Sequence, residues 1–327
     1  MTLLDYTRVE AAARTLEGIA VRTPAITSRA LDATVGFPVL CKAENLQHTG
    51  SFKFRGAYSH TANLSEAVRA RGIIGASSGN HAQALALTAQ ILNIPATVVI
   101  PDDAPRAKAQ GARALGARII RYQRTHQDRD AIVTKLAERD GLAIVPSANS
   151  ADVMAGAGTA ALELLTDHPN ITTLLVPVGG GGLAAGTAVI AKHLNPHIQV
   201  IGVEPWSATD TLQSLRTGTR VTLPTAPRTI ADGLGHITPA ELPFAVNNRL
   251  LDDIVTVTDH DITEAMGYAF RHLKVVAEPS GACALAALLA GQITHTDGTI
   301  GVVISGGGVD LTGFLTTIAP YKEKARV

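Results

Sequence analysis

The sequence predicts an α/β fold in which parallel sheets carry helices on both faces. Short apolar runs, typical of buried strands, alternate with helix-forming segments along the chain, and this alternation favours parallel strands joined by crossover helices. The length agrees, because 327 residues with 46% hydrophobic content can bury a large core, which we expect to be shared between two lobes. Residues that follow strands are the first candidates for a site, because ligands of such sheets bind beyond the carboxyl ends of the strands.

Individual elements are placed by their boundaries. Ala96–Ile100 is an expected strand, and Asn93-Ile94-Pro95 ends the helix before it, because a proline disfavours helix in the residue that precedes it. A helix at Pro105–Gly116 then leads to a strand at Ala117–Tyr122. The remaining expected elements are strands near Leu142–Val145, Thr172–Val178, Ile198–Val203 and Thr299–Ile304, and a helix at Ala184–Leu194.

Composition and charge argue against several classes of function. The formal net charge is zero and no basic run is present, so neither nucleic acid nor an anionic membrane is an expected partner. Cys41 and Cys283 make no disulfide framework, and the N-terminus shows no secretory signal, so we expect a cytoplasmic protein. Leu174–Ala191 carries no charge, but its glycines and its proline favour a buried core segment over a membrane span.

Four consecutive glycines, Gly179–Gly182, stand between an expected strand and an expected helix. Glycines leave the backbone amides unobstructed, and a helix N-terminus favours an anion, so the loop predicts a phosphate site. It has neither the GxGxxG spacing nor GK[ST], and a nucleotide motif is therefore not supported. The alternative is a tight strand–helix turn, which rarely needs four glycines.

Lys53 lies between two aromatic residues, Phe52 and Phe54. Apolar surroundings disfavour the ammonium, so we expect its pKa to fall toward the range in which the amine attacks a carbonyl. A Schiff base with an aldehyde cofactor is the main use of such a lysine. A surface lysine beside two core phenylalanines is the alternative for this motif taken alone.

A lysine for an aldehyde and a loop for a monophosphate together suggest pyridoxal 5′-phosphate. The chain resembles the fold-type II (tryptophan-synthase-β-like) family of pyridoxal-phosphate enzymes, and within it the serine and threonine dehydratases and the eukaryotic-type serine racemases. The resemblance runs nearly end to end. It rests on the motifs SFKFRGA, SSGNHAQALAL, AGAGT, PVGGGG, TIADGL, EPSGA and SGGGVDL, in that order.

The resemblance implies two lobes, each a mainly parallel twisted sheet flanked by helices, with the cofactor in the cleft between them. The larger lobe would be discontinuous, formed by residues 1–48 and 147–327, and residues 49–146 would form the smaller. We expect a homodimer and no C-terminal regulatory domain of the kind found on biosynthetic threonine dehydratases.

Roles for individual residues also follow from the resemblance. Lys53 would hold the cofactor aldehyde and then act as the base at the substrate Cα. Ser305 would meet the pyridine nitrogen, where a neutral hydroxyl weakens the ring as an electron sink and favours β-elimination over transamination. The remaining cofactor residues would be Phe52, Asn80 at the phenolic oxygen, Gly179, Gly180, Gly181 and Gly182 at the phosphate, and Gly233 and Glu278 along the ring. The substrate carboxylate would be bound at Ser77, Ser78, Gly79, Asn80 and His81, although Ser-Ser-Gly-Asn is also an ordinary helix cap.

These roles imply β-elimination from a small β-hydroxy L-amino acid such as serine or threonine, giving a 2-keto acid and ammonia. Ser78 leaves two alternatives open, because threonine dehydratases usually carry alanine there, whereas serine racemases and threo-3-hydroxyaspartate dehydratases carry serine. A hydroxyl facing Lys53 across the cofactor would supply the second acid/base that racemisation needs; otherwise Ser78 only caps a helix.

A divalent-cation site is the last feature that the resemblance implies. Glu204 and Asp210, with the carbonyl of Ala208, are spaced as in the eukaryotic-type serine racemases. Hard oxygen ligands suit Mg²⁺, Ca²⁺ or Mn²⁺. Two solvated carboxylates in a loop are the alternative.

Three departures from the family pattern put the substrate in doubt. Gly308 stands where relatives usually carry asparagine, and Ala157 where they carry glutamine. The stretch 146–150 lacks the usual His-Pro.

Two other classes of function stay open. One is a dinucleotide-dependent enzyme, which the absent GxGxxG disfavours, and the other is a catalytically silent cofactor-binding protein.

Overall fold

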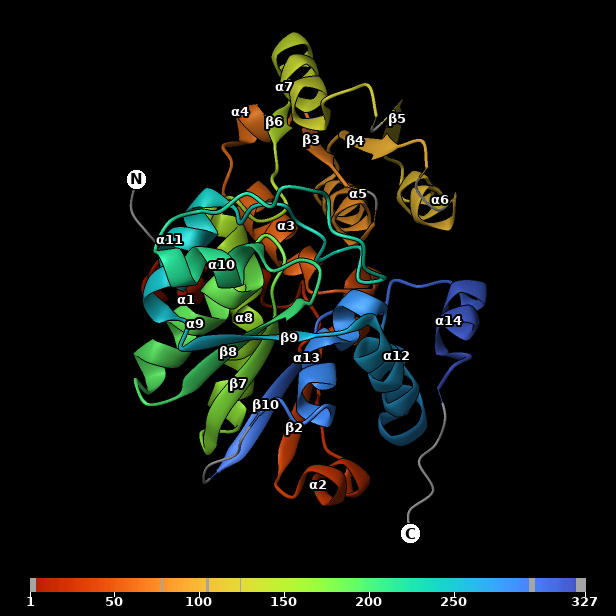
Figure 1. The fold of residues 1–327 in the computed structure, drawn as a ribbon. Coiled ribbons are helices and arrows are strands. Elements are labelled where there is room, and N and C mark those ends of the chain that lie inside the picture. Colours follow the sequence, from red (N-terminus) through yellow and green to blue (C-terminus); the bar gives the residue numbers. More distant parts are fainter. Residues whose placement is uncertain (1–3, 78, 104–105, 124, 294–297, 322–327) are drawn as a thin grey trace.

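Two separate β-sheets organise the chain (Figure 1). The computed structural model describes residues 4–77, 79–103, 106–123, 125–293 and 298–321. Six strands form the larger sheet in the order β1-β2-β10-β7-β8-β9, and every neighbouring pair is parallel except β1 with β2. The strands are β1 (Ala25–Ile26), β2 (Val39–Ala43), β7 (Ile171–Pro177), β8 (Gln199–Pro205), β9 (Asp253–Val257) and β10 (Thr299–Ile304).

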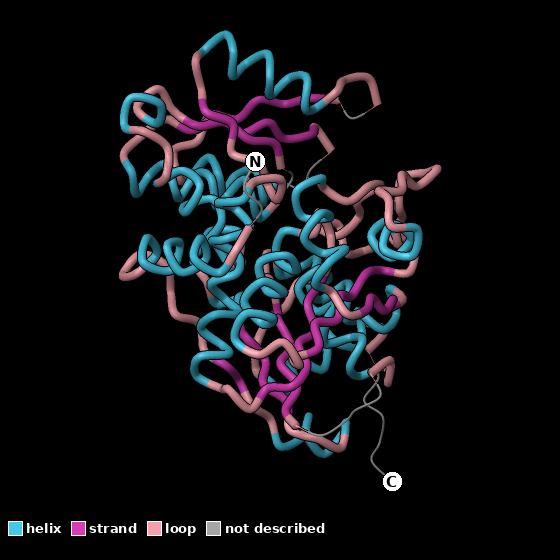
Figure 2. Tube along the Cα trace, turned by 90° about the vertical axis from the view of Figure 1, so that its left-hand side faces the viewer, coloured by secondary structure: helices cyan, strands magenta, loops and turns pink. Residues whose placement is uncertain are grey.

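The smaller sheet is wholly parallel, in the order β5-β4-β3-β6. Its strands are β3 (Ile73–Ala76), β4 (Ala96–Pro101), β5 (Arg118–Tyr122) and β6 (Ala143–Ile144). The two sheets lie toward opposite ends of the molecule (Figure 2). All four strands fall within residues 49–146, and the larger sheet falls outside them, which fits the predicted discontinuous arrangement. The boundary residues themselves stay a prediction.

Helices cover both faces of each sheet. In the smaller lobe α3 (Lys53–Ala62), α5 (Asn80–Leu92) and α6 (Arg106–Ala114) contribute to one apolar core, and α7 (Arg129–Asp140) covers the opposite face. Around the larger sheet, α1 (Tyr6–Leu16), α8 (Ala151–Asp167) and α9 (Gly182–Leu194) pack on one face, and α2 (Arg29–Val35), α12 (Asp259–Tyr268) and α13 (Pro279–Leu289) on the other. The fold also contains α4 (Glu66–Arg69), α10 (Asp210–Thr217), α11 (Glu241–Leu250), α14 (Leu311–Ile318), the 3-10 turns η1 (Glu44–Leu46) and η2 (His48–Gly50), and the π-helical turn η3 (Ala269–Leu273).

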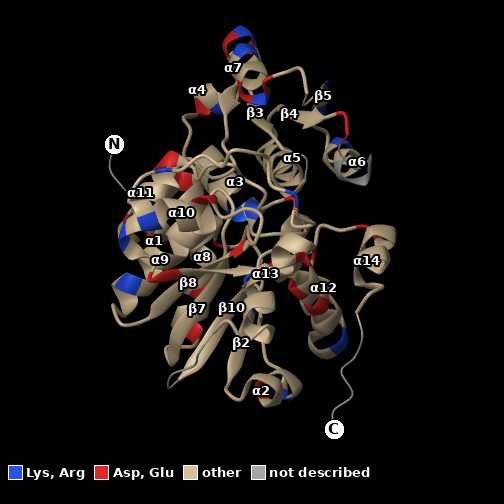
Figure 3. Ribbon diagram, in the orientation of Figure 1, with Lys and Arg blue, Asp and Glu red and all other residues tan. Residues whose placement is uncertain are grey.

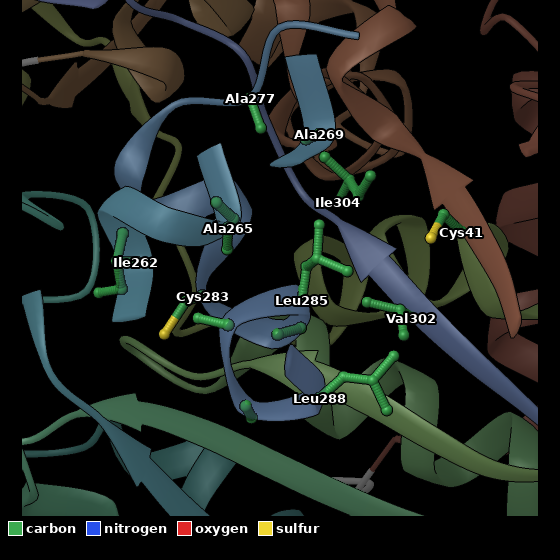
Figure 4. Close-up of a cluster of buried hydrophobic side chains, with 14 of the residues drawn as sticks. Cys41, Ile262, Ala265, Ala269, Ala277, Cys283, Leu285, Leu288, Val302 and Ile304 are labelled. Atoms are coloured by element: carbon green, nitrogen blue, oxygen red, sulfur yellow. The ribbon is translucent and has the colours of Figure 1, made fainter. Parts of the chain in front are cut away.

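Charged side chains of both signs are spread over the helices of the two lobes (Figure 3). Helix α14, at the outside of the larger lobe, carries none, because its sequence LTGFLTTI contains no charged residue. On one large-sheet face, Cys283 packs with apolar side chains of α12, α13 and β10, and Cys41 lies nearby on β2 (Figure 4). Both cysteines are free and buried, as the absence of a disulfide framework predicts.

The apolar runs predicted β4, β5, β6, β7, β8 and β10 within one or two residues, whereas β1, β2, β3 and β9 were not predicted. The strand expected at Thr299–Ile304 has those bounds, and the helix expected at Pro105–Gly116 is α6, with Pro105 outside the described residues. Helix α9 begins at Gly182, two residues earlier than predicted, because the last loop glycine already belongs to its first turn. The uncharged run Leu174–Ala191 is β7, the glycine loop and most of α9. Among the described residues no helix is long and apolar enough to cross a membrane.

Candidate active site

One pocket contains all the residues that were predicted to hold the cofactor. They come from segments far apart in the sequence, and several follow the carboxyl ends of strands of the larger sheet, as expected for parallel sheets. The set is Phe52, Lys53, Asn80, Gly179, Gly180, Gly181, Gly182, Gly233, Glu278 and Ser305. The structure therefore brings these residues together, and their binding of the cofactor stays a prediction.

Lys53 is the first residue of α3 and lines the pocket. Its Nζ donates a hydrogen bond to the carbonyl oxygen of Ser147 at 2.9 Å and lies 4.9 Å from the centre of the Phe52 ring. Burial lowers the pKa of Lys53 from 10.5 to about 8, and the carboxylate of Glu278 offsets part of that fall. An amine with this pKa is partly neutral, and hence nucleophilic, near neutral pH.

The glycine loop joins β7 to α9 by a path that excludes side chains. A Cβ on Gly179 would lie 2.9 Å from the carbonyl oxygen of Gly233, and one on Gly181 would lie 2.7 Å from the side-chain amide nitrogen of Asn247. Gly181 also has φ +86°, a conformation that other residues rarely adopt. Helix α9 has no side-chain cap, so its first N–H groups are available to an anion.

Asn80 opens α5 at the end of the loop that follows β3. Its Nδ2 donates to Glu278, while its Oδ1 is buried and has no hydrogen-bond partner among the described residues. A side-chain amide carries two N–H donors and one oxygen. Its second N–H and its unpartnered oxygen therefore provide polar groups for a ligand in this pocket.

The loop after β10 is fastened to the segment that carries Lys53. The carbonyl oxygen of Ser305 accepts a hydrogen bond from the Phe52 N–H at 3.1 Å, and Ser51 forms a bridge with Gly306. Ser305 is buried at the pocket wall. The loop after β10 and the segment that leads into α3 thus place Lys53 and Ser305 in one pocket.

The predicted substrate residues lie between β3 and α5, and Ser78 lies outside the described residues. Ser77 accepts a hydrogen bond from the Gly79 N–H at 3.1 Å. The His81 ring bonds the carbonyl oxygen of Val145 at 2.9 Å, and burial, with a contribution from Lys53, lowers its pKa to about 3. This ring is thus held inside the smaller lobe, so a carboxylate would be bound by other groups of the segment, such as its backbone N–H groups and the Asn80 side chain.

Glu204 and Asp210 are both fully buried at the junction of β8 and α10. Glu204 accepts hydrogen bonds from the N–H groups of Thr211 and Leu212, each at 3.0 Å. Both carboxylate oxygens of Asp210 lack a hydrogen-bond partner among the described residues. Burial is the main cause that raises the pKa of Glu204 to about 8, and the nearby charge of Asp210 adds to it. Burial also raises the pKa of Asp210 to about 7.

These carboxylates fit a cation. Two buried like charges, of which Asp210 has both oxygens unpaired, require either protons or a positive ion. The alternative of two solvated carboxylates is wrong for these residues. No group of three or more His, Cys, Asp or Glu able to hold a metal occurs in the described part of the chain. The remaining ligands would thus be the carbonyl of Ala208 and water.

The sequence did not identify several residues in or beside the pocket. Ser147 holds the Lys53 amine, and Ala148 lines the pocket beside the glycine loop. The only signal was that stretch 146–150 departs from the family pattern. His236 had no signal at all, yet its ring lies 3.1 Å from where a Gly179 Cβ would be, and burial, with a contribution from Lys53, lowers its pKa to about 4. It is therefore a neutral imidazole beside the loop at neutral pH.

Of the other two departures, one lies at the site and one in the core. A Cβ on Gly308 would overlap Asn80 Oδ1, so this glycine leaves room for the Asn80 side chain. Ala157 is buried within α8.

A family model described as pyridoxal-phosphate dependent enzyme matches residues 16–306. The chain belongs to this family. An L-threo-3-hydroxyaspartate ammonia-lyase from Pseudomonas sp is 42% identical over 318 residues, which cover 97% of this chain and 99% of the relative. A serine racemase from Schizosaccharomyces pombe is 39% identical over 311 residues, 95% of this chain and 96% of the relative.

Solved structures agree with this assignment. Maize serine racemase matches the enzyme with a TM-score of 0.92 at 36% identity, over 97% of this chain and 98% of that one. The threonine deaminase of T.th. matches with a TM-score of 0.89 at 39% identity, over 94% and 99% of the two chains. The two-lobed α/β fold predicted from the sequence is thereby confirmed.

The pocket also fits the family's cofactor. An aldehyde needs an amine that is neutral at working pH, and Lys53 has the required lowered pKa. A phosphate needs exposed amides at a helix N-terminus, and the uncapped start of α9 supplies them. The buried, unpartnered Oδ1 of Asn80 is a further polar atom that a ligand in the pocket can satisfy.

Proposed function

We propose that the enzyme catalyses β-elimination from a small β-hydroxy L-amino acid such as serine or threonine, releasing a 2-keto acid and ammonia. The observation that carries the proposal is the single pocket in which Lys53, with its lowered pKa, shares a wall with Ser305 and lies beside the glycine loop. The names of the relatives support the reaction class.

The cofactor, when bound, supplies an aldehyde for covalent capture of an amine and a ring that withdraws electrons from the substrate Cα. With a pKa of about 8, roughly one tenth of Lys53 is neutral at pH 7 and able to accept the Cα proton. The N-terminus of α9 and Gly179–Gly182 bind and orient the phosphate. The neutral hydroxyl of Ser305 leaves the ring a weak electron sink, which favours elimination.

Racemisation of serine and dehydration of threo-3-hydroxyaspartate are the alternatives for the same pocket. Relatives named for both activities are about 40% identical to this chain over most of its length. Ser78 favours these alternatives, because it is serine rather than the alanine usual in threonine dehydratases. The imidazole of His236 lies beside the glycine loop, and burial lowers its pKa to about 4; we propose it as a further polar group near the site.

We further propose that Glu204, Asp210 and the carbonyl of Ala208 bind Mg²⁺, with Ca²⁺ or Mn²⁺ as substitutes. The support is the buried, unpartnered carboxylate of Asp210 and its charge coupling to Glu204. Thr211 and Leu212 donate to Glu204 and orient its carboxylate, a role that outer hydrogen bonds commonly play at metal sites.

We infer that the enzyme forms a homodimer through an apolar surface that includes α14. Leu311 is 74% exposed, Leu315 54% and the neighbouring Phe270 52%. The Phe270 ring packs on Phe314, which anchors α14, with the ring centroids 5.5 Å apart. A helix without a charged residue and with two exposed leucines is typical of an interface. The cytoplasmic location remains a prediction from composition.

The proposed reaction is tested by measuring keto acid and ammonia from L-serine, L-threonine and L-threo-3-hydroxyaspartate, with and without EDTA. We expect release from at least one of them. Lys53→Ala should abolish both turnover and the borohydride-stable link to the cofactor, because nucleophile and base are lost together. Absence of keto acid from every substrate, with the cofactor still bound to Lys53, would reject elimination and leave racemisation to be tested by chiral chromatography.

A further inference from the structure

A buried ionic cluster lies two residues along the chain from Lys53. Arg55 and Glu44 are 0% exposed, and Lys42 is 2% exposed. All three guanidinium nitrogens of Arg55 donate hydrogen bonds to carboxylates. Both oxygens of Glu44 accept, at 2.8 and 2.9 Å. Both oxygens of Glu163 accept as well, at 2.7 and 2.9 Å. Lys42 donates to the same Glu163 at 2.5 Å. The two cations and two anions balance.

The cluster is fully bonded as well as neutral. Arg55 also donates to the hydroxyl of Thr159 and to the carbonyl oxygen of Val21, each at 3.1 Å. Burial alone would lower the pKa of Arg55, but Glu44 and Glu163 more than offset this and raise it. The planar guanidinium group can pair with two carboxylates, each through two hydrogen bonds, in only one orientation. The Arg55 side chain is therefore held in a fixed direction.

That direction fixes the rotation of α3 about its axis. Residues two apart in a helix point roughly 200° apart, so Arg55 and Lys53 project from nearly opposite sides of α3. Arg55 enters the ionic cluster, while Lys53 lines the cofactor pocket. Any rotation that turned the amine out of the pocket would also pull the guanidinium from its carboxylates.

Backbone contact fixes the position of α3 in the same way. A Cβ on Gly56 would lie 2.8 Å from the carbonyl oxygen of Val153, and one on Gly156 would overlap the carbonyl oxygen of Arg55. The partners of Arg55 lie on η1, α8 and the segment before β1, all outside the smaller sheet. The start of α3 is therefore fastened to the larger lobe, which also carries the glycine loop.

We propose that Arg55, held by Glu44 and Glu163, is a positioning residue that keeps Lys53 aimed at the cofactor. Arg55 is not among the residues that line the pocket, and it acts by fixing the direction of α3. Because the partners of Arg55 belong to the larger lobe, the anchor holds Lys53 in a fixed relation to the glycine loop of that lobe.

The test uses Arg55→Lys, which keeps the charge of the cluster and removes the planar fork. Lys42→Arg is the matched control. It alters the same buried cluster, but the Lys42 amine donates its hydrogen bonds to Thr23 and Glu163, neither of which lies on α3. In the cofactor-free proteins, the pH dependence of Lys53 labelling by an amine reagent is followed by mass spectrometry. The rate of covalent capture of pyridoxal phosphate is followed by absorbance.

With Arg55→Lys we expect the labelling midpoint of Lys53 to rise from about pH 8 toward 10.5 and capture to slow about 10-fold or more. Lys42→Arg should lower thermal stability without either change. If Arg55→Lys does not fold, Thr159→Val, which removes one hydrogen bond to Arg55, should give a smaller change in the same direction. The proposal is overturned if Arg55→Lys folds and shows wild-type labelling and capture. If Arg55→Lys does not fold, the same result for Thr159→Val overturns it.

Discussion

Lys53 shows how a residue can have the predicted property for a different reason. The sequence attributed its lowered pKa to two flanking aromatics. In the structure only Phe52 lies near the amine, whereas Phe54 packs on His48 and Tyr58 in the core of the smaller lobe. The pKa falls because the amine is buried in the pocket. The alternative of a surface lysine is thereby excluded by its place in the pocket rather than by its neighbours in sequence.

In the cofactor-free protein we expect half-maximal labelling of Lys53 near pH 8, against a value above 10 for exposed lysines. The folded pKa lies below the unfolded one, so between about pH 8 and 10.5 the unfolded chain binds more protons and the protein gains stability as pH rises. Lys53→Met should flatten this rise in urea titrations. A labelling midpoint near 10.5 would show that the amine is solvated.

Ser78 carries a second prediction at this scale, made from the sequence alone. If its hydroxyl is the acid/base opposite Lys53, Ser78→Ala should remove formation of D-serine from L-serine while elimination from L-substrates survives. A general acid/base contributes typically about 10²–10⁴-fold, so the loss is measurable by chiral chromatography. Equal D-serine from both proteins would make Ser78 only a helix cap, and none from either would mark a dehydratase without racemase activity.

At the scale of the element, helix N-termini supply much of the local chemistry. Helix α9 leaves its first amides free for a phosphate, whereas α10 has its first turn bonded to Glu204. The difference lies in the preceding residues. Four glycines offer no side chain to α9, and a buried carboxylate at the end of β8 caps α10.

The buried carboxylates of Glu204 and Asp210 predict that the effect of Mg²⁺ on the melting temperature depends on pH. The folded pKa values of Glu204 and Asp210, about 8 and 7, exceed those of the unfolded chain. The metal-free protein therefore loses stability as pH rises from about 4 toward 8. A cation replaces the protons, so added Mg²⁺ should raise the melting temperature more at pH 8 than at pH 6. An increase of roughly 5 °C is expected at 100 times the dissociation constant.

Glu204→Gln should abolish the response to Mg²⁺, and Glu264→Gln, at a half-buried position of α12, is a control that should keep it. A melting temperature that is indifferent to Mg²⁺ and to EDTA at both pH values would reject the cation site.

For the whole molecule, the sequence predicted part of each sheet and part of the pocket lining. Buried parallel strands appear as uncharged apolar runs, so β7, β8 and β10 were readable locally. The glycine loop was readable because close backbone approach and an uncapped helix demand glycine. The split of the larger lobe came from the family resemblance, because strand order depends on contacts between distant segments.

Contacts of that kind also explain what was missed. Ser147 reaches Lys53 across 94 positions of sequence, and His236 reaches the glycine loop from a long connection between α10 and α11. Neither has a periodic pattern or a motif. The Arg55 cluster joins segments separated by more than 100 residues, so its two basic and two acidic members look unrelated in the sequence.

The exposed face of α14 supports the last prediction, which concerns the assembly. If Leu315 lies in the dimer interface, Leu315→Lys places a charge in an apolar contact, and the penalty for burying it should shift the protein toward monomer. Ile91→Lys on α5 of the smaller lobe is the matched control, because Ile91 is 42% exposed and lies outside the proposed interface. Sedimentation velocity across a concentration series should give a dimer for the wild type and for Ile91→Lys, and a weakened one for Leu315→Lys. Identical sedimentation of all three proteins would exclude Leu315 from any interface, and a monomeric wild type would reject the homodimer itself.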